Sequence, residues 1–174
     1  MNFEHLILSG QSLSVGWNGE PVISTTSEDP DARRIHPSDG GVGPMAGGNP
    51  LYPTWQLPEM TLAYRIAAQA AGLVATSTHG QGGASIAQLS KGGSSGRFEQ
   101  AITIAGTVKS NRVAQGDAYT VGSFHWVQGE TDQNEGMPAA HYLSALGQLI
   151  EDYRADIPVS IGQPAEFQVI LSQM

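Results

Sequence analysis

The chain has 174 residues, with eight basic and 16 acidic side chains, a formal charge of -8 and an isoelectric point near 4.9. A chain of this length forms one domain with a sizeable core. Its negative charge argues against a protein that binds the phosphate backbone of nucleic acid. Because cysteine is absent, disulfides, thiolate nucleophiles and cysteine-ligated zinc are excluded, whereas the cellular compartment stays open.

Short apolar runs alternate with segments of helical period along the chain. Residues 3–9 form an apolar run that ends at Gly10, as in a buried parallel strand. Residues 18–58 are rich in Pro, Gly, Asp, Ser and Thr without an apolar period, which predicts a long excursion of turns and loops. Further strands are predicted at 73–78, 119–127 and 167–171, and helices at 58–72, 98–113 and 139–153.

This alternation predicts an α/β fold with a mostly parallel sheet and helices on both faces, which is a three-layer α/β/α sandwich. Ligands of such sheets bind beyond the carboxyl ends of the strands. Three of the predicted strands end in glycine-rich polar blocks, whereas the last strand reaches almost to the final residue, which is typical of a core strand cut short. The blocks are Gly10-Gln11-Ser12, Gly80-Gln81-Gly82-Gly83 and Gln128-Gly129-Glu130-Thr131-Asp132.

Ser12 is the candidate nucleophile. It follows a strand and a glycine, where a hydroxyl can project from a sharp turn and receive backbone N–H support. A serine at a strand-to-helix junction is also typical of a helix N-cap, and the flanking residues are not the Gly-x-Ser-x-Gly of α/β-hydrolases. A serine nucleophile needs a general base and oxyanion donors as well, and both must come from elsewhere in the chain.

The second block has three interpretations. Gly82 and Gly83 can let backbone N–H groups approach a substrate oxygen, or they can form a plain tight turn. The stretch is also a near miss to the dinucleotide fingerprint, with Glu99 at a suitable distance for a ribose contact. That fingerprint normally follows the first strand of its unit, whereas a whole βα unit precedes it here. A nucleotide-binding domain stays an alternative.

The third block places an amide, a glycine and two carboxylates at a strand end. Gln128 can donate N–H to a developing oxyanion, and Glu130 or Asp132 could orient a histidine. The two carboxylates could instead cap the helix that follows.

Taken together and in order, Gly-Gln-Ser, Gly-Gly-Ala-Ser-Ile and Trp-Val-Gln-Gly-Glu-Thr-Asp closely resemble the SGNH-hydrolase superfamily, in particular its sialate O-acetylesterase and acetylxylan esterase group, carbohydrate esterase family 6. The resemblance implies a flavodoxin-like fold and a serine esterase that removes acetyl groups from sugar hydroxyls through an acyl-enzyme, without metal or cofactor. Ser12 matches the family nucleophile. The implied oxyanion hole comprises the N–H of Ser12, the N–H of Gly83, with Gly82 as the alternative, and the side chain of Gln128. Glu130 matches a residue that is structural in many members and a proposed triad acid in some.

The long loop after the nucleophile would overhang this site. Trp17, Tyr52 and Trp55 could form a wall that stacks on a sugar, or they could anchor the loop to the domain. Gln11, Gly82 and Trp17 complete the predicted substrate-binding set. The expected ligand is an acetylated carbohydrate, and a catalytically inactive carbohydrate-binding domain on the same fold is the second alternative.

The general base is the point where the sequence departs from the family. The family takes its histidine from an Asp-x-x-His block after the last strand, whereas the last histidine here is His141. We therefore expect a C-terminally incomplete domain, whose uncovered apolar surface would favour a homo-oligomer. His79 is the histidine nearest the predicted site, His125 is expected to pack inside the domain, and His141 is expected on an exposed helix face.

Neither a zinc site nor a membrane segment is expected. No histidine pair has the spacing and carboxylate partner of a zinc site. No basic segment precedes the first apolar run, which is too short for a signal sequence or a membrane span. The compartment stays unknown, with action outside the cell still open.

Overall fold

The computed structural model of the chain describes residues 1–11, 14, 32–35, 40–44, 72–164 and 166–172. These residues form a six-stranded sheet in the order β3-β2-β4-β1-β5-β6, together with helices α2 to α5. The strands are β1 (Asn2–Gly10), β2 (Ala32–Ile35), β3 (Val42–Pro44), β4 (Leu73–Thr78), β5 (Ala118–Val127) and β6 (Gln168–Leu171). The helices are α2 (Ile86–Leu89), α3 (Arg97–Ala114), α4 (Glu130–Asn134) and α5 (Ala139–Ile161).

The sheet is mostly parallel, as predicted. β1 lies between β4 and β5 and runs parallel to both, β2 and β6 extend the parallel set, and only β3 is antiparallel to its neighbour. Nearly all of β1 is buried, which explains its continuous apolar run. Because β4, β1 and β5 are adjacent and parallel, their carboxyl ends meet at one edge of the sheet.

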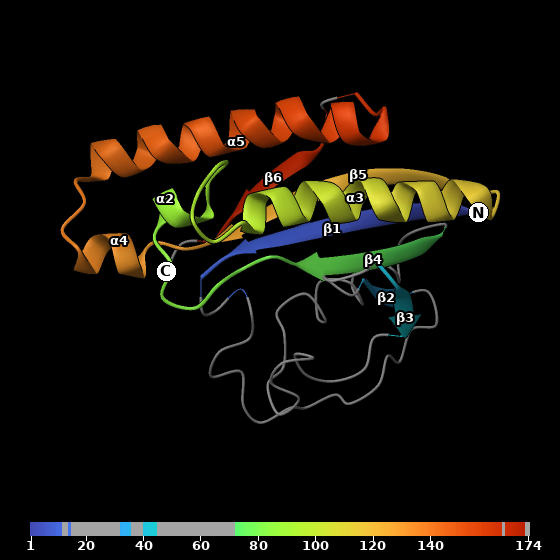
Figure 1. Cartoon of the computed structure of the whole chain (residues 1–174), viewed down its shortest axis with the longest axis horizontal. Helices are drawn as coiled ribbons and strands as arrows, with labels where there is room; N and C mark the ends of the chain where they lie inside the picture. Colours follow the sequence, from blue (N-terminus) through green and yellow to red (C-terminus); the bar gives the residue numbers. More distant parts are fainter. Residues whose placement is uncertain (12–13, 15–31, 36–39, 45–71, 165, 173–174) are drawn as a thin grey trace.

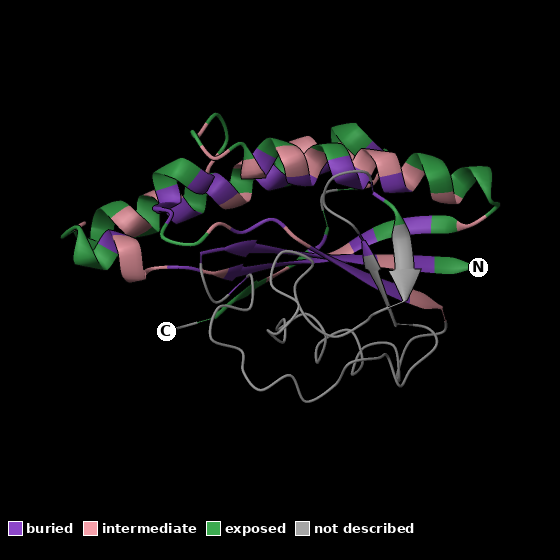
Figure 2. Ribbon diagram, turned by 60° about the horizontal axis from the view of Figure 1, so that its bottom comes forward, coloured by how far each residue is buried: buried purple, intermediate pink, exposed green. Residues whose placement is uncertain are grey.

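The described helices cover one face of the sheet (Figure 1). Figure 2 shows the buried sides of these helices turned toward the strands. Tyr153 of α5 joins the layers, since its ring centroid lies 4.5 Å from that of Phe98 on α3 and 4.2 Å from that of Phe124 on β5. The helix predicted at 58–72 lies outside the described residues, so a helical layer on the other face stays a prediction. None of the described helices is long and apolar enough to cross a membrane.

One prediction about the strands is wrong. β2 and β3 lie within the stretch that was expected to hold only turns and loops; they are short, and the sequence of β2, Ala-Arg-Arg-Ile, carries no apolar alternation. The predicted strand at 167–171 is observed as β6, an edge strand of the described sheet. It pairs with β5 alone, and Ile170 and Leu171 are 39% and 51% exposed.

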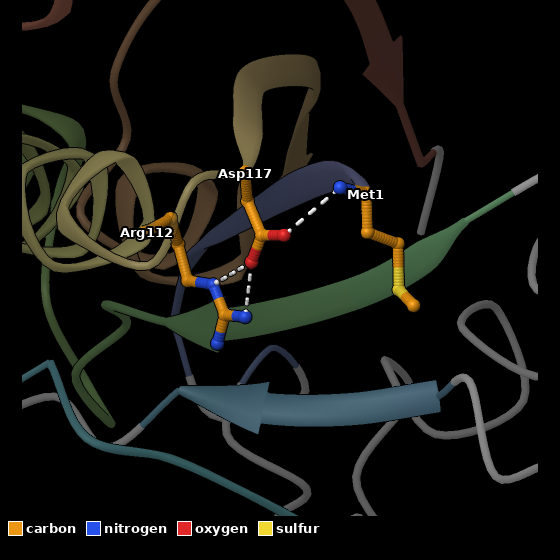
Figure 3. Close-up of polar contacts among 3 residues, drawn as sticks. All are labelled: Met1, Arg112 and Asp117. Atoms are coloured by element: carbon orange, nitrogen blue, oxygen red, sulfur yellow. Dashed lines mark hydrogen bonds and ion pairs between the residues drawn. The ribbon is translucent and has the colours of Figure 1, made fainter.

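An ion cluster lies at the amino end of the sheet (Figure 3). Asp117 Oδ1 lies 3.0 Å from the α-amino nitrogen of Met1, and Oδ2 accepts from Arg112 Nε at 3.0 Å and from Nη2. The hydrogen bonds from Arg112 and from the α-amino group hold the pKa of Asp117 below its usual range. Arg112 also lies over the ring of Phe3, 4.8 Å from its centroid. The cluster therefore ties the starts of β1 and β5 to the end of α3.

Candidate active site

The structure brings the three glycine-rich blocks together at the carboxyl ends of β4, β1 and β5. Backbone hydrogen bonds join them directly: Gln81 N–H donates to Gly10 O at 2.9 Å, and Gln11 N–H donates to Val127 O at 3.0 Å. The edge of the sheet that the sequence assigned to ligand binding is therefore a single, hydrogen-bonded cluster of loops.

Gly10 makes this close junction sterically feasible. Its φ is +142°, and a Cβ at this position would lie 2.0 Å from Val127 O. Only glycine fits, because any side chain would collide with the backbone of β5. Ser12, the predicted nucleophile, follows Gln11 directly in sequence and lies outside the described residues. The same holds for Trp17, Tyr52 and Trp55 of the predicted aromatic wall.

The loop after β4 presents unoccupied amides. Ala84 N–H donates to Gln81 O at 3.3 Å, which closes a turn with Gly83 at φ +69°. Both glycines of this turn are exposed, and a Cβ on Gly82 or Gly83 would meet nothing within 4 Å. No described residue accepts a hydrogen bond from either N–H group. These amides can therefore approach a ligand oxygen, as the sequence predicted for an oxyanion hole.

Gln128 is buried, and its side-chain amide is fully engaged. Nε2 donates to Ala84 O at 3.2 Å and to Asp132 Oδ2, while Oε1 accepts from the hydroxyl of Tyr142 at 2.8 Å. An amide nitrogen has two hydrogens, so neither is spare in this arrangement. Gln128 reaches a substrate oxygen only by exchanging one of these bonds, and the bond to Ala84 O connects it to the glycine loop.

Asp132 caps a different helix from the one expected. It lies in α4, yet its Oδ2 accepts from the backbone N–H of Ile86, the first residue of α2, at 2.9 Å. The carboxylate thereby links the loop after β5 to the loop after β4. Its Oδ1 is buried without a hydrogen-bond partner among the described residues, and the same holds for Oε2 of Glu130.

Gln11 binds the backbone of the third block, Gln128 to Asp132, through its side chain. Its side chain is 5% exposed, and Oε1 accepts from the N–H of Thr131 at 3.2 Å. Glu130 beside it lines a cavity of about 250 Å³ between β5, α4, α5 and β6. The other residues that line the cavity are Trp126, Gln128, Gly129, Gln133, Tyr142, Leu146, Leu171 and Ser172.

Two of the described histidines, His5 and His79, are buried and hydrogen-bonded to core side chains. His5 lies between Tyr119 OH and Ser77 Oγ, 2.6 Å from each, and Ser77 Oγ lies 2.8 Å from Nε2 of His79. Burial lowers the pKa of His5 to about 3 and that of His79 to about 4. His79 is thus next to the glycine loop in sequence, but its ring points into the core and does not suit a general base.

The remaining histidines fit the sequence-based expectations where they are described. His125 is buried beside Ser123, and burial lowers its pKa to about 4. His141 is exposed on the first turn of α5. Among the described residues, no group of three His, Asp or Glu side chains could hold a metal ion.

Residues 57–168 match the family of carbohydrate esterases described as sialic acid-specific acetylesterases. The chain belongs to this family. The match covers well over half of the chain; it includes the Gly82-Gly83 loop and Gln128 to Asp132, and it does not include Ser12. The family identity predicted from the three blocks is therefore confirmed.

Two solved structures share the fold of this carbohydrate esterase. A protein from Arabidopsis thaliana aligns with a TM-score of 0.69 and 16% identity, over 97% of this chain and 72% of that one. A carbohydrate acetylesterase from Xanthomonas citri aligns with a TM-score of 0.60 and 15% identity, over 95% of this chain and 49% of that one. The chain thus spans about half the length of the Xanthomonas enzyme. No curated protein matches it.

Two contacts of the candidate site could not be found from sequence. Tyr142 binds Gln128, and Asp132 binds Ile86, although 14 and 46 residues separate the partners. Tyr142 falls in a segment that the sequence indicates only as an amphipathic helix, so no motif pointed to it. The Gln-Gly-Glu-x-Asp block did signal that Asp132 matters, without indicating what it binds.

Proposed function

We propose that this domain is a serine esterase that removes O-acetyl groups from carbohydrate. Membership of the carbohydrate esterase family supports the reaction class. The observation that carries the proposal is the exposed turn at Gly82 and Gly83, whose N–H groups have no partner among the described residues and lie at the edge where β1 leads into Ser12.

In this mechanism the general base takes the proton of Ser12 Oγ as this oxygen attacks the acetyl carbonyl, and the sugar hydroxyl leaves with that proton. Water then hydrolyses the acyl-enzyme to acetate and free Ser12. The negative charge that develops on the carbonyl oxygen is stabilised by the N–H groups of Ser12 and Gly83. Gln128 supplies a third donor by exchanging its bond to Ala84 O for one to the acyl oxygen. Each such donor contributes about 10²–10³-fold to kcat in serine hydrolases.

The other predicted site residues take supporting roles in this proposal. Gln11 is buried and binds Thr131, so it holds the loop after β5. Glu130 has a buried oxygen without a described partner and lines the 250 Å³ cavity, so it can accept the N–H of a catalytic histidine. Gly82 and Trp17 are assigned to the sugar.

We expect the general base to come from outside the described residues. His5, His79 and His125 are buried, and their ring nitrogens bind core side chains. His141 is exposed and has no described partner that would orient it.

The test is hydrolysis of 4-nitrophenyl acetate by the chain and its Ser12→Ala variant. Exposed histidines hydrolyse this ester slowly, so only the difference between the two proteins is informative. We expect a C-terminally longer chain that carries a histidine after β6 to exceed its own Ser12→Ala variant by about 10³-fold or more in kcat/KM. Ser144→Ala, which replaces an exposed serine on α5, should match the unsubstituted chain. Equal rates for the 174-residue chain and its Ser12→Ala variant would show that these residues lack a working base. Equal rates for the longer pair as well would contradict the esterase and favour a sugar-binding domain, which binds acetylated xylan or sialic acid without turnover.

A further inference from the structure

Asp132 is buried in an arrangement that stability alone does not explain. Its side chain is 1% exposed, and no ion pair to it occurs among the described residues. Oδ2 accepts two hydrogen bonds, from the N–H of Ile86 and from Nε2 of Gln128, whereas Oδ1 has no described partner. Burying a carboxylate without a cation and with an unsatisfied oxygen is unfavourable, so a role in the site must be considered.

The orientation of the Gln128 amide is what Asp132 controls. A rotation by 180° exchanges the oxygen and nitrogen of the amide, and the neighbouring groups select one of the two orientations. The hydroxyl of Tyr142 does not discriminate, because it can donate to Oε1 or accept from Nε2. Ala84 O and Oδ2 of Asp132 both only accept, so the reversed orientation would place Oε1 against the two of them. The charged carboxylate opposes that orientation more strongly than the carbonyl does.

This orientation directs the second N–H of Gln128 toward the glycine loop. One N–H is held by Asp132, and the other donates to Ala84 O, next to Gly83. An acyl oxygen bound to Gly83 N–H competes with Ala84 O for that second hydrogen. The same carboxylate also fixes the loop from its other side, through Ile86 N–H.

We propose that Asp132 is a positioning residue. It holds the Gln128 amide so that the N–H bound to Ala84 O faces the Gly82-Gly83 loop, where a substrate oxygen can replace Ala84 O as its acceptor. It also ties that loop to the start of α4. The inference rests on the proposed esterase, since it assigns the orientation of an oxyanion donor. Asp132 itself touches no substrate.

Kinetics of Asp132→Ala and Asp132→Asn test the role. Alanine removes both hydrogen bonds, so we expect kcat to fall by about 10- to 100-fold, with KM changed less than about threefold, because the lost contact acts in the transition state. Asparagine keeps an acceptor oxygen for Ile86 and Gln128, and since Oδ1 has no described partner, kcat should stay within about fivefold of the unsubstituted chain. Asp152→Ala, on α5, is the matched control. An unchanged kcat in Asp132→Ala, or an Asn variant as slow as the Ala variant, would overturn the proposal.

A spectroscopic test separates this inference from the esterase itself. The side-chain NH₂ of Gln128, assigned through its loss in Gln128→Ala, should give two well-separated, slowly exchanging proton signals. We expect Asp132→Ala to collapse them toward solvent-exposed values, whereas Asp132→Asn and Tyr142→Phe retain them. Unchanged signals in Asp132→Ala, or their loss in Tyr142→Phe, would show that another group sets the orientation. Because this measurement needs no turnover, it tests Asp132 in an inactive chain as well, and its outcome is independent of whether the esterase proposal holds.

If Asp132→Ala does not melt cooperatively, the Asn and Phe variants decide the question. Retained Gln128 signals in both support Asp132 as the orienting group. Loss of the signals in folded Asp132→Asn overturns it.

Discussion

The carboxylates at the two ends of the sheet, Asp117 and Asp132, have opposite surroundings. At the amino end, both oxygens of Asp117 bind cations, the guanidinium of Arg112 and the α-amino group of Met1. At the carboxyl end, Asp132 has no described cation and leaves one oxygen unpaired. The paired charges at the amino end join β1, β5 and α3, whereas the unpaired oxygen at the carboxyl end is the kind of exception that points to a functional site.

A hydrogen-bonded series of buried polar side chains connects these ends on the helix-covered face. It runs from Tyr119 at the start of β5 through His5 and Ser77 to His79 after β4. The next side chain is Gln100 of α3, whose Oε1 lies 3.4 Å from Nδ1 of His79. Because both histidines are neutral, this series of side chains joins the two ends without a buried charge.

The sharpest way to break the carboxyl end is Gly10→Ala. The new Cβ would meet the backbone of β5 at 2.0 Å, and the φ of +142° is unfavourable for alanine. We expect a loss of about 5 kcal/mol or more in the free energy of unfolding, or no folded protein. Urea unfolding measures it, with Gly147→Ala as control, because nothing lies near that helical position and alanine there should stabilise by about 0.5–1 kcal/mol. A Gly10→Ala variant of unchanged stability would contradict the close junction.

Acidification should lower the free energy of unfolding through the two buried histidines, His5 and His79. Unfolded histidines bind a proton near pH 6.5, whereas burial lowers the pKa of His5 to about 3 and of His79 to about 4. Between these values the unfolded state binds more protons, so the free energy of unfolding decreases as the pH falls, by up to about 1.4 kcal/mol per pH unit for each histidine. Urea unfolding at pH 7, 6 and 5 measures the slope. His79→Gln should flatten it and His141→Gln, at an exposed position, should not; equal slopes in both variants would argue against a neutral, buried His79.

The amino end should be the more tolerant of the two. Arg112→Gln removes the ion pair with Asp117 and the contact over Phe3. The ring contact alone contributes about 1 kcal/mol, so we expect a modest loss of stability, smaller than that of Gly10→Ala. Turnover of 4-nitrophenyl acetate should be unchanged, because the cluster lies at the far end of the sheet. A large loss of kcat in a stable Arg112→Gln protein would show that the two ends are coupled more tightly than their contacts indicate.

The elements that the sequence predicted well are those with a strong local signal. The strand at 73–78 is observed at the same residues, and the helix predicted at 98–113 is observed as Arg97–Ala114. Both are apolar segments bounded by glycine or polar residues, so local pattern and tertiary packing agree. β2 was missed because its strand character comes from pairing with β4 and not from its own four residues.

The candidate site divides in the same way. That Gly82, Gly83 and Gln128 lie together follows from their places after adjacent parallel strands, which a sequence can indicate. The occupied donors of Gln128 and the inward ring of His79 depend on contacts between distant segments. Asp132 shows the limit most clearly, since either a helix cap or a histidine partner was expected, and it caps α2 from 46 residues away.

The central place of β1 also sets the order in which the protein can assemble during synthesis. Phe3 pairs with Leu73 on one side and with Tyr119 on the other, so β1 is made before both of its neighbours and is enclosed only when β5 has been added. At about 5–20 residues per second, a ribosome needs roughly 5–20 s to add the residues between β1 and β5. Throughout that interval an apolar strand has no neighbour along one or both edges, which makes the nascent chain a natural client for a chaperone.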